Sequence, residues 1–286
     1  MQACGIAGYL YIQLTGNSYS MRFTVGKATI EFIKKPKAKH GKFIQGLLGV
    51  GQVGLMAGRQ IIDALGAEKI ADLYSVDFLY PNVALPGVVY EDDNFVDLHK
   101  DEIYYDEKNE IFILTGIYQG TSPESYYNLA HAILGFCEEM GVKEVYTLGG
   151  YGTGAKIEEP RTYGVVAESE AKAMLEKAEI PLLEAPKGTL GATGLAGILI
   201  PLAAKNGFRS ICLLAETQGM YPDPKASKAA VKALARLLGI EIPTKELDEQ
   251  IEAMEKEFAK MEEYARQLAE MYKAPAAKDE RLSYIG

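Results

Sequence analysis

Three glycines within residues 49–54 have the spacing that most directly suggests a ligand-binding site in this chain. Gly49, Gly51 and Gly54 follow the pattern G-x-G-x-x-G and come directly after an apolar run at residues 43–48. In nucleotide-binding proteins this pattern makes a tight turn between a strand and a helix, and the helix N-terminus then faces a pyrophosphate. One hypothesis is therefore a nucleotide- or nucleoside-binding enzyme that uses this loop and a second glycine cluster at residues 149–154.

The other parts of a dinucleotide site do not follow in the sequence. Such a site places an acidic residue about 20 positions after the glycines, at the end of the second strand. Asp72 and Asp77 are at that distance, but Asp72 falls inside the predicted second strand at residues 70–74. Later His, Lys and Cys residues suggest no hydride-transfer site, and paired metal-ligand spacing is absent from the three histidines, His40, His99 and His131.

We therefore expect no catalytic residue, no cofactor and no metal. Gly49, Gly51 and Gly54 are interpreted as structural glycines, which let the chain turn sharply and let a helix pack closely against the first core strand. A phosphorylase or hydrolase that uses Glu216 and the glycine loops is an enzyme alternative that rests on analogy of fold alone.

Composition limits the classes of partner. The chain has 286 residues, 48% of them hydrophobic, and a net charge of −9 with a pI of about 5.1, which argues against nucleic acid or an anionic membrane as partner. The longest nearly apolar run, residues 194–204, contains Pro201 and is too short to span a bilayer. The three cysteines are far apart and suit a reducing cytoplasm, with Cys137 and Cys212 as core residues.

An alternation of strand and helix patterns predicts an α/β core domain at residues 21–242. Ser122 with Pro123, and Asp223 with Pro224, are typical of helix starts. Residues 103–114 predict a β-hairpin inside this alternation. Repeated strand, helix and strand favours a three-layer sandwich with a mostly parallel central sheet.

Residues 1–20 contain no Lys or Arg, so they lack the basic region of a secretory signal. We expect Met21 to be the natural start and residues 1–20 to be a non-native or extended segment. Mass spectrometry of the native protein tests this expectation, and an intact Met1 would contradict it.

A long amphipathic helix is predicted at residues 243–273, because residues 244–272 contain no Gly or Pro. Its apolar residues alternate spacings of four and three, which is a heptad seam. This seam packs either on its own domain or between subunits, and it contains Leu247, Ile251, Met254, Phe258, Met261 and Leu268.

The last segment, residues 274–286, begins with small and charged residues, which predicts a flexible tail. Its last five residues nevertheless include one aromatic and two branched aliphatic side chains, which favours a tethered peptide for another protein's pocket. The expected partner-binding residues are Leu282, Ser283, Tyr284, Ile285 and Gly286.

Over residues 42–238 the chain resembles the archaeal proteasome assembly chaperone homologues. The resemblance rests on the order and spacing of five motifs, at residues 49–54, 147–152, 188–197, 213–217 and 221–224. It implies a fold like that of nucleoside phosphorylases in a protein that binds other proteins and is not an enzyme.

The same resemblance gives the tail a role. Proteasome activators and several of these chaperones end in a hydrophobic residue, a Tyr and any residue, which insert between neighbouring α-subunits. Here Tyr284 is third from the end and Ser283 precedes it, so the register differs. The resemblance implies a cytoplasmic, homo-oligomeric archaeal factor that binds the α-subunits of the 20S proteasome, as assembly chaperone or activator.

Overall fold

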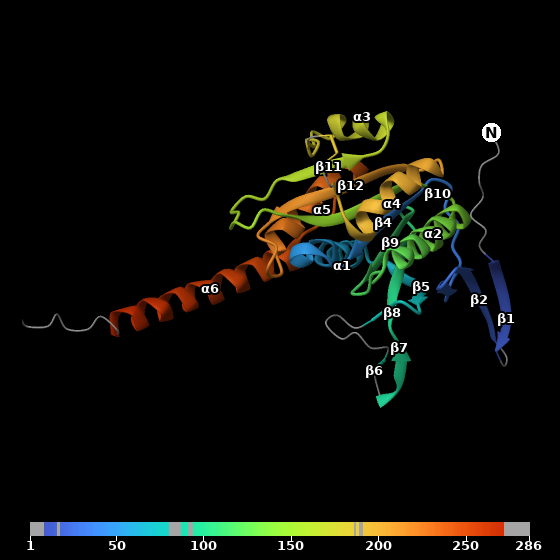
Figure 1. Cartoon of the computed structure of the whole chain (residues 1–286), viewed down its shortest axis with the longest axis horizontal. Helices are drawn as coiled ribbons and strands as arrows, with labels where there is room; N and C mark the ends of the chain where they lie inside the picture. The colour runs from blue at the N-terminus through green and yellow to red at the C-terminus, as the bar shows by residue number, and fades with distance from the viewer. Residues whose placement is uncertain are drawn as a thin grey trace, which may run out of the picture.

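The structure is a computed structural model of the chain, and it describes residues 9–15, 18–79, 87–90, 94–185, 187–188 and 191–271. The predicted partner-binding tail, Leu282 to Gly286, lies outside these residues. Within them, one ten-stranded sheet runs through the molecule, and a separate pair of short strands, β6 (Val88–Tyr90) and β7 (Val96–Leu98), projects from it (Figure 1).

Four neighbouring strands of the sheet are parallel. Their order is β9, β4, β10 and β12. Both faces of these strands are covered, which explains their nearly continuous apolar sequences. The bounds are β9 (Ile111–Gly116), β4 (Gly41–Leu47), β10 (Val142–Gly152) and β12 (Arg209–Thr217).

Antiparallel strands extend the sheet on both sides of these parallel strands. The predicted hairpin at residues 103–114 is confirmed, because β8 pairs with β9 in antiparallel register. On the far side of β12, β11 (Thr162–Val166) forms the edge. The larger flank consists of β8 (Lys100–Asp106), β5 (Glu68–Ser75), β3 (Ala28–Phe32), β2 (Ser18–Val25) and β1 (Tyr9–Thr15).

The position of β1 is relevant to the prediction that the natural chain starts at Met21. β1 is an edge strand and pairs with β2, in which Met21 stands opposite Ile12. A chain that began at Met21 would lack β1 and the first residues of β2. The natural start stays a prediction.

Helices cover both faces of the sheet and make the outer layers. On one face, Ile61 of α1 (Val53–Leu65) and Val231 of α5 (Pro224–Leu238) share a buried cluster with α3 (Ser169–Lys177). On the other face, α2 (Pro123–Met140) and α4 (Gly194–Lys205) pack on the side that Phe43 and Leu47 of β4 occupy. The predicted three-layer α/β sandwich is confirmed, although its parallel part is limited to four neighbouring strands.

The helix starts follow the capping residues that the sequence contains. Ser122 accepts a hydrogen bond from the backbone N–H of Ser125, and the Ser125 hydroxyl accepts one from the N–H of Ser122. Asp223 accepts from the N–H of Ala226 at 3.0 Å, and a proline follows each capping residue. These local bonds explain why α2 and α5 begin where predicted.

The last helix, α6 (Lys245–Met271), confirms the predicted long C-terminal helix. It starts on the body of the molecule and projects away from it (Figure 1). No helix in the described part of the chain is long and apolar enough to cross a membrane.

Candidate functional site

The turn after β4 is held by contacts that explain two of its three glycines. Gly51 has a positive φ of 61°, and a Cβ there would lie 2.6 Å from the hydroxyl oxygen of Thr217. A Cβ on Gly54 would lie 2.5 Å from the carbonyl oxygen of Leu148 and 2.7 Å from that of Leu47. Gly54 thus lets α1 pack directly on β4 and β10.

Gly49 differs from the interpretation that the sequence suggested. Its φ of −164° is extended backbone, and a Cβ there would meet no atom within 4 Å. Neither the turn nor the helix packing requires a glycine at this position. α1 and β4 also approach each other closely at Gly58 and Gly46, because a Cβ on Gly46 would lie 2.8 Å from the Cα of Gly58; neither residue was predicted as a structural glycine.

The Gly54 contact predicts a loss of stability on substitution. Gly54→Ala should lower the free energy of unfolding by about 1–3 kcal/mol, because the added methyl overlaps two backbone oxygens that cannot move aside. Gly49→Ala is the matched control and should change it by less than about 0.5 kcal/mol. Urea denaturation of both variants checks the pair, and equal effects would contradict the packing role of Gly54.

The second glycine cluster is strand rather than loop over most of its length. Gly149, Gly150 and Gly152 continue β10 and pair with β12. A Cβ on Gly150 would lie 2.3 Å from the carbonyl oxygen of Val50, so the cluster lets the turn after β4 cross close to β10.

Thr217 and Asp223 connect the turns that follow the parallel strands, through their side chains and the Asp223 backbone. The Thr217 hydroxyl donates to Asp223 at 2.8 Å and accepts from the N–H of Gly219 at 3.2 Å. The N–H of Asp223 donates to the carbonyl oxygen of Gly51 at 2.9 Å. The turn after β4 and the start of α5 are therefore fixed to each other.

A cleft of about 580 Å³ opens at the carboxyl ends of β4 and β10. Among its described lining residues there is no Lys, Arg or His, and the one carboxylate is that of exposed Glu184. No side chain of this lining could neutralise a pyrophosphate. The cleft lies where α/β folds bind ligands, but its lining does not suit a dinucleotide.

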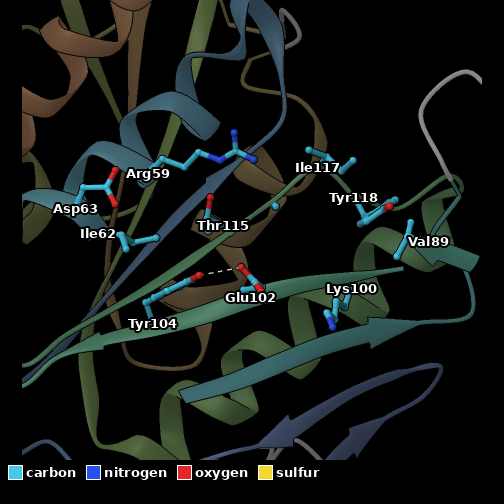
Figure 2. Close-up of a pocket in the computed structure, with 11 residues that line it drawn as sticks. Arg59, Ile62, Asp63, Val89, Lys100, Glu102, Tyr104, Thr115, Ile117 and Tyr118 are labelled. Atoms are coloured by element: carbon cyan, nitrogen blue, oxygen red, sulfur yellow. Dashed lines mark hydrogen bonds between the residues drawn. The ribbon is translucent and has the colours of Figure 1, made fainter. Parts of the chain in front are cut away.

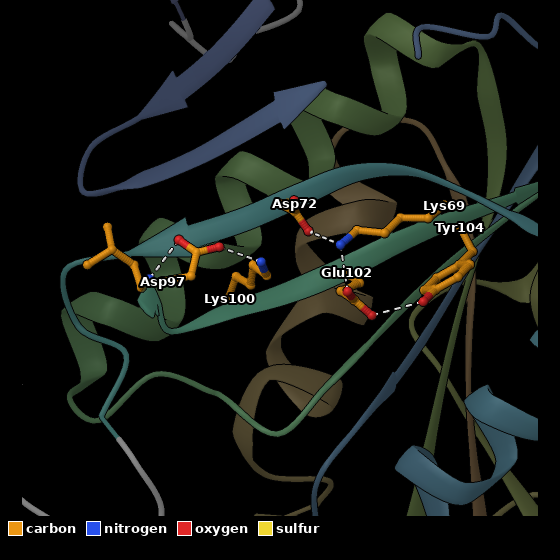
Figure 3. Close-up of polar contacts among 7 residues, drawn as sticks. Lys69, Asp72, Asp97, Lys100, Glu102 and Tyr104 are labelled. Atoms are coloured by element: carbon orange, nitrogen blue, oxygen red, sulfur yellow. Dashed lines mark hydrogen bonds and ion pairs between the residues drawn. The ribbon is translucent and has the colours of Figure 1, made fainter. Parts of the chain in front are cut away.

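Asp72 is also far from the position that a dinucleotide would need. Its strand, β5, is separated from β4 by β8 and β9. Its carboxylate lies 2.8 Å from the ammonium of Lys69, which also contacts Glu102 at 2.6 Å (Figure 3). Asp72 therefore belongs to a charged, open face of the antiparallel flank.

Burial and hydrogen bonding on this face shift the pKa values of Tyr104 and Glu102. The Tyr104 hydroxyl donates to Glu102 at 2.9 Å. Burial, with Glu102 as second cause, raises the pKa of Tyr104 to about 12. Partial burial alone would raise the pKa of Glu102, but the hydrogen bonds from Lys69 and Tyr104 outweigh it and lower that pKa. The face carries paired charges of both signs and shows no preference for one class of ligand.

A second cavity, of about 390 Å³, lies between α1 and β8. Figure 2 shows Arg59 and Asp63 of α1 turned apart, with the Arg59 side chain extending toward Thr115 of β9. Lys100 and Glu102 of β8 also line the cavity, so its charges are mixed.

A buried carboxyl supports the loop that lines this second cavity. Asp101 is fully buried and accepts a hydrogen bond from the N–H of Tyr118 at 3.1 Å. Burial raises its pKa well above the usual value. The folded chain thus keeps the Asp101 proton to a higher pH than the unfolded chain, whose carboxyl ionises near pH 4.

Asp101→Asn should therefore change how stability depends on pH. As pH rises from about 4 through the folded pKa, the wild-type chain loses about 1.4 kcal/mol per unit, whereas the uncharged amide does not titrate. The variant should gain stability relative to wild type between pH 4 and pH 8, measured by urea denaturation. An equal difference at both values would contradict a protonated Asp101.

Two cysteines and one histidine occupy buried positions. Cys137 and Cys212 are fully buried, as predicted, and burial raises the pKa of both thiols, that of Cys212 to about 11. His99 is also buried, and its Nδ1 lies 2.7 Å from the hydroxyl of Tyr118. Among the described residues no group of His, Cys, Asp and Glu could hold a metal ion.

The base of α6 is fixed to the body by one buried glutamine of α1. The Gln60 amide donates to the carbonyl oxygen of Pro243 at 3.0 Å and to Glu246 at 2.6 Å. Its oxygen accepts from the N–H of Leu247 at 3.0 Å. Further along α6, Glu255 lies 2.9 Å from Lys225. These bonds set the direction in which α6 leaves the body.

The predicted heptad seam divides into two parts. Leu247 is buried and Ile251 and Met254 are half-buried, whereas Met261 is 64% exposed. The seam begins on its own domain, and Met261 lies where α6 projects. The side chains of Phe258 and Leu268 are outside the described part of the structure.

Comparison with protein families and solved structures agrees with this geometry. The family model of PAC2 matches residues 43–262, more than half of the 286 residues. The chain belongs to the PAC2 family. An uncharacterized protein of Methanocaldococcus jannaschii is 33% identical over 244 residues, which cover 85% of this chain and 91% of that protein.

Two solved structures from Pyrococcus furiosus are similar to this PAC2-family chain. PbaB, an archaeal proteasome activator, is 31% identical with a TM-score of 0.73, and the match covers 82% of this chain and 99% of PbaB. PbaA, an archaeal homolog of proteasome-assembly chaperone, is 24% identical with a TM-score of 0.66, over 85% of this chain and 97% of PbaA. The resemblance inferred from the sequence motifs is confirmed.

Proposed function

We propose that this chain is a proteasome-binding factor, an assembly chaperone or activator that engages the α-subunits of the 20S particle. The observation that carries the proposal is the similarity to PbaB, an archaeal proteasome activator, at 31% identity over 82% of this chain. In this proposal the chain works in the cytoplasm by binding a protein partner and catalyses no reaction.

The binding segment is residues 282–286, at the end of the C-terminal tail. Two features support this choice. α6 (Lys245–Met271) projects from the body, so its far end lies away from the sheet (Figure 1). The Gln60 hydrogen bonds fix the direction of that projection. A tail that begins at the tip of a directed helix can reach a partner without contact between the partner and the core.

The chain acts as a homo-oligomer whose subunits meet along the outer part of α6. Met261 there is 64% exposed in the single chain, and a second copy of the helix would cover it. Several tails displayed together bind far more tightly than one, because each later contact is intramolecular. Oligomerisation thus makes weak tail peptides effective.

A pull-down with purified 20S particles and, separately, with free α-subunits tests the proposal. An activator should retain the assembled particle, and an assembly chaperone should retain the free α-subunits. Retention of neither would overturn the proposed function.

A further inference from the structure

The cleft at the carboxyl ends of β4 and β10 contains a polar group that the protein leaves unpaired. Gln45 of β4 lines the cleft and is 1% exposed, yet its Oε1 has no hydrogen-bond partner. A buried carbonyl oxygen without a donor costs about 1–3 kcal/mol, so its presence in an apolar strand needs an explanation.

Strand register places this side chain beside the start of α4. Gln45 pairs with Thr147 of β10, and paired residues of neighbouring strands lie on the same face. The Thr147 hydroxyl donates to the carbonyl oxygen of Ala196, in the first turn of α4, at 3.1 Å. Gln45 therefore faces the same turn of α4.

The N-terminus of α4 supplies hydrogen-bond donors at the same place. Thr193, its N-cap residue, makes no capping hydrogen bond with its side chain, and Thr193, Gly194 and Ala196 all line the cleft. The first N–H groups of a helix have no partner within the helix and attract an acceptor. α4 has 12 residues, enough for this N-terminal effect.

The rest of the lining disfavours an anionic ligand. Its described residues include no cation, and most of them are glycines or have aliphatic side chains. A volume of about 580 Å³ is in the range of small-molecule sites, which is about 300–1,000 Å³. The aliphatic lining residues are Leu47, Leu48, Val50, Leu148, Leu183 and Leu214.

We propose that this cleft binds an uncharged small molecule in which a carbonyl oxygen stands beside an N–H group. The carbonyl oxygen accepts from the first turn of α4, and the N–H donates to Gln45 Oε1. Lactam nucleobases and their nucleosides have this pair of groups on a flat, uncharged ring. The inference goes beyond the proposed proteasome function and assigns the cleft a binding role of its own.

Calorimetric titration of the full chain with inosine and with uridine tests the proposal. At least one should bind and raise the melting temperature. Adenosine, which lacks the lactam, should bind at least tenfold more weakly, and the 5′-monophosphate of the bound nucleoside should bind no more tightly than the nucleoside itself. Binding of neither lactam nucleoside, or a monophosphate that binds tenfold more tightly, would overturn the proposal.

Gln45→Leu separates a ligand role from a structural one. The variant removes an unpaired buried oxygen, so its melting temperature should be equal to or above that of wild type, while nucleoside binding should fall at least tenfold. Gln250→Leu, at an exposed position of α6, is the control and should bind as wild type. Unchanged binding in Gln45→Leu would show that a water, not a ligand, satisfies Gln45.

The proposed nucleoside binding by the cleft and the proposed 20S binding by the tail can be tested separately. A chain without residues 282–286 should still bind the nucleoside, and Gln45→Leu should still bind 20S particles. Loss of both activities in either variant would contradict the separation of the two sites.

Discussion

A chain that lacks residues 282–286 should not bind 20S particles, while its core domain and its oligomeric state should stay intact. This is the expected result if the tail carries the contact. The core is built from residues of the sheet and of α1 to α5, and α6 meets it mainly at its first turns. Surface plasmon resonance on immobilised 20S particles measures binding, and thermal unfolding with size-exclusion chromatography measures the rest.

The register of the tail can be tested with single substitutions. Tyr284→Ala should abolish most binding, because an aromatic anchor in a pocket carries much of a short peptide's affinity. Ser283→Ala is the matched control, since it changes the preceding residue and removes no apolar surface. Unchanged binding after the five-residue deletion would refute the tail mechanism, and equal losses in both substitutions would refute the anchor role of Tyr284.

The sequence predicted the elements better than their arrangement. α2 and α5 begin where predicted, because Ser122 and Asp223 form their caps with residues only three positions away. The order of the strands depends instead on contacts between distant residues. β4 lies between β9 and β10, and β5 lies three strands away from it, so the sheet continues into an antiparallel flank. Short-range patterns contain no direct signal for such an order.

The candidate sites also divide into features that short-range sequence patterns predicted and features that they did not. The seam and the glycines were visible as repeated spacings, although Gly49 is not required by packing. Gln45 and Gln60 were missed: Gln45 is a single polar residue within an apolar strand, and Gln60 follows Arg59 on a helix whose apolar spacing alone was used for the prediction. Each position is itself a signal: a glutamine within a core strand or on a core helix face must bond something. Here Gln60 bonds α6, and Gln45 has no partner in the protein.

A substitution in the outer part of the heptad seam is expected to have the second large effect on binding to 20S particles. Met261→Glu should dissociate the proposed homo-oligomer, because it would bury a carboxylate of each copy in the proposed interface between α6 helices. Once the tails are separated, apparent affinity for 20S particles should fall by about 10²- to 10⁴-fold through the loss of avidity. Multi-angle light scattering measures the oligomeric state, and surface plasmon resonance measures the affinity.

Tyr264→Glu is the control for this change. Tyr264 is 64% exposed, as Met261 is, but it lies off the heptad seam, so a charge there stays in solvent. The two substitutions place the same charge on the same helix at equal exposure, and a difference between them depends on the seam alone. Because Met261 lies beyond the contacts of Gln60 and Lys225, the unfolding temperature of the core should stay the same in both. An oligomer that survives Met261→Glu would place the subunit interface elsewhere, whereas dissociation without loss of affinity would show that one tail is sufficient for binding.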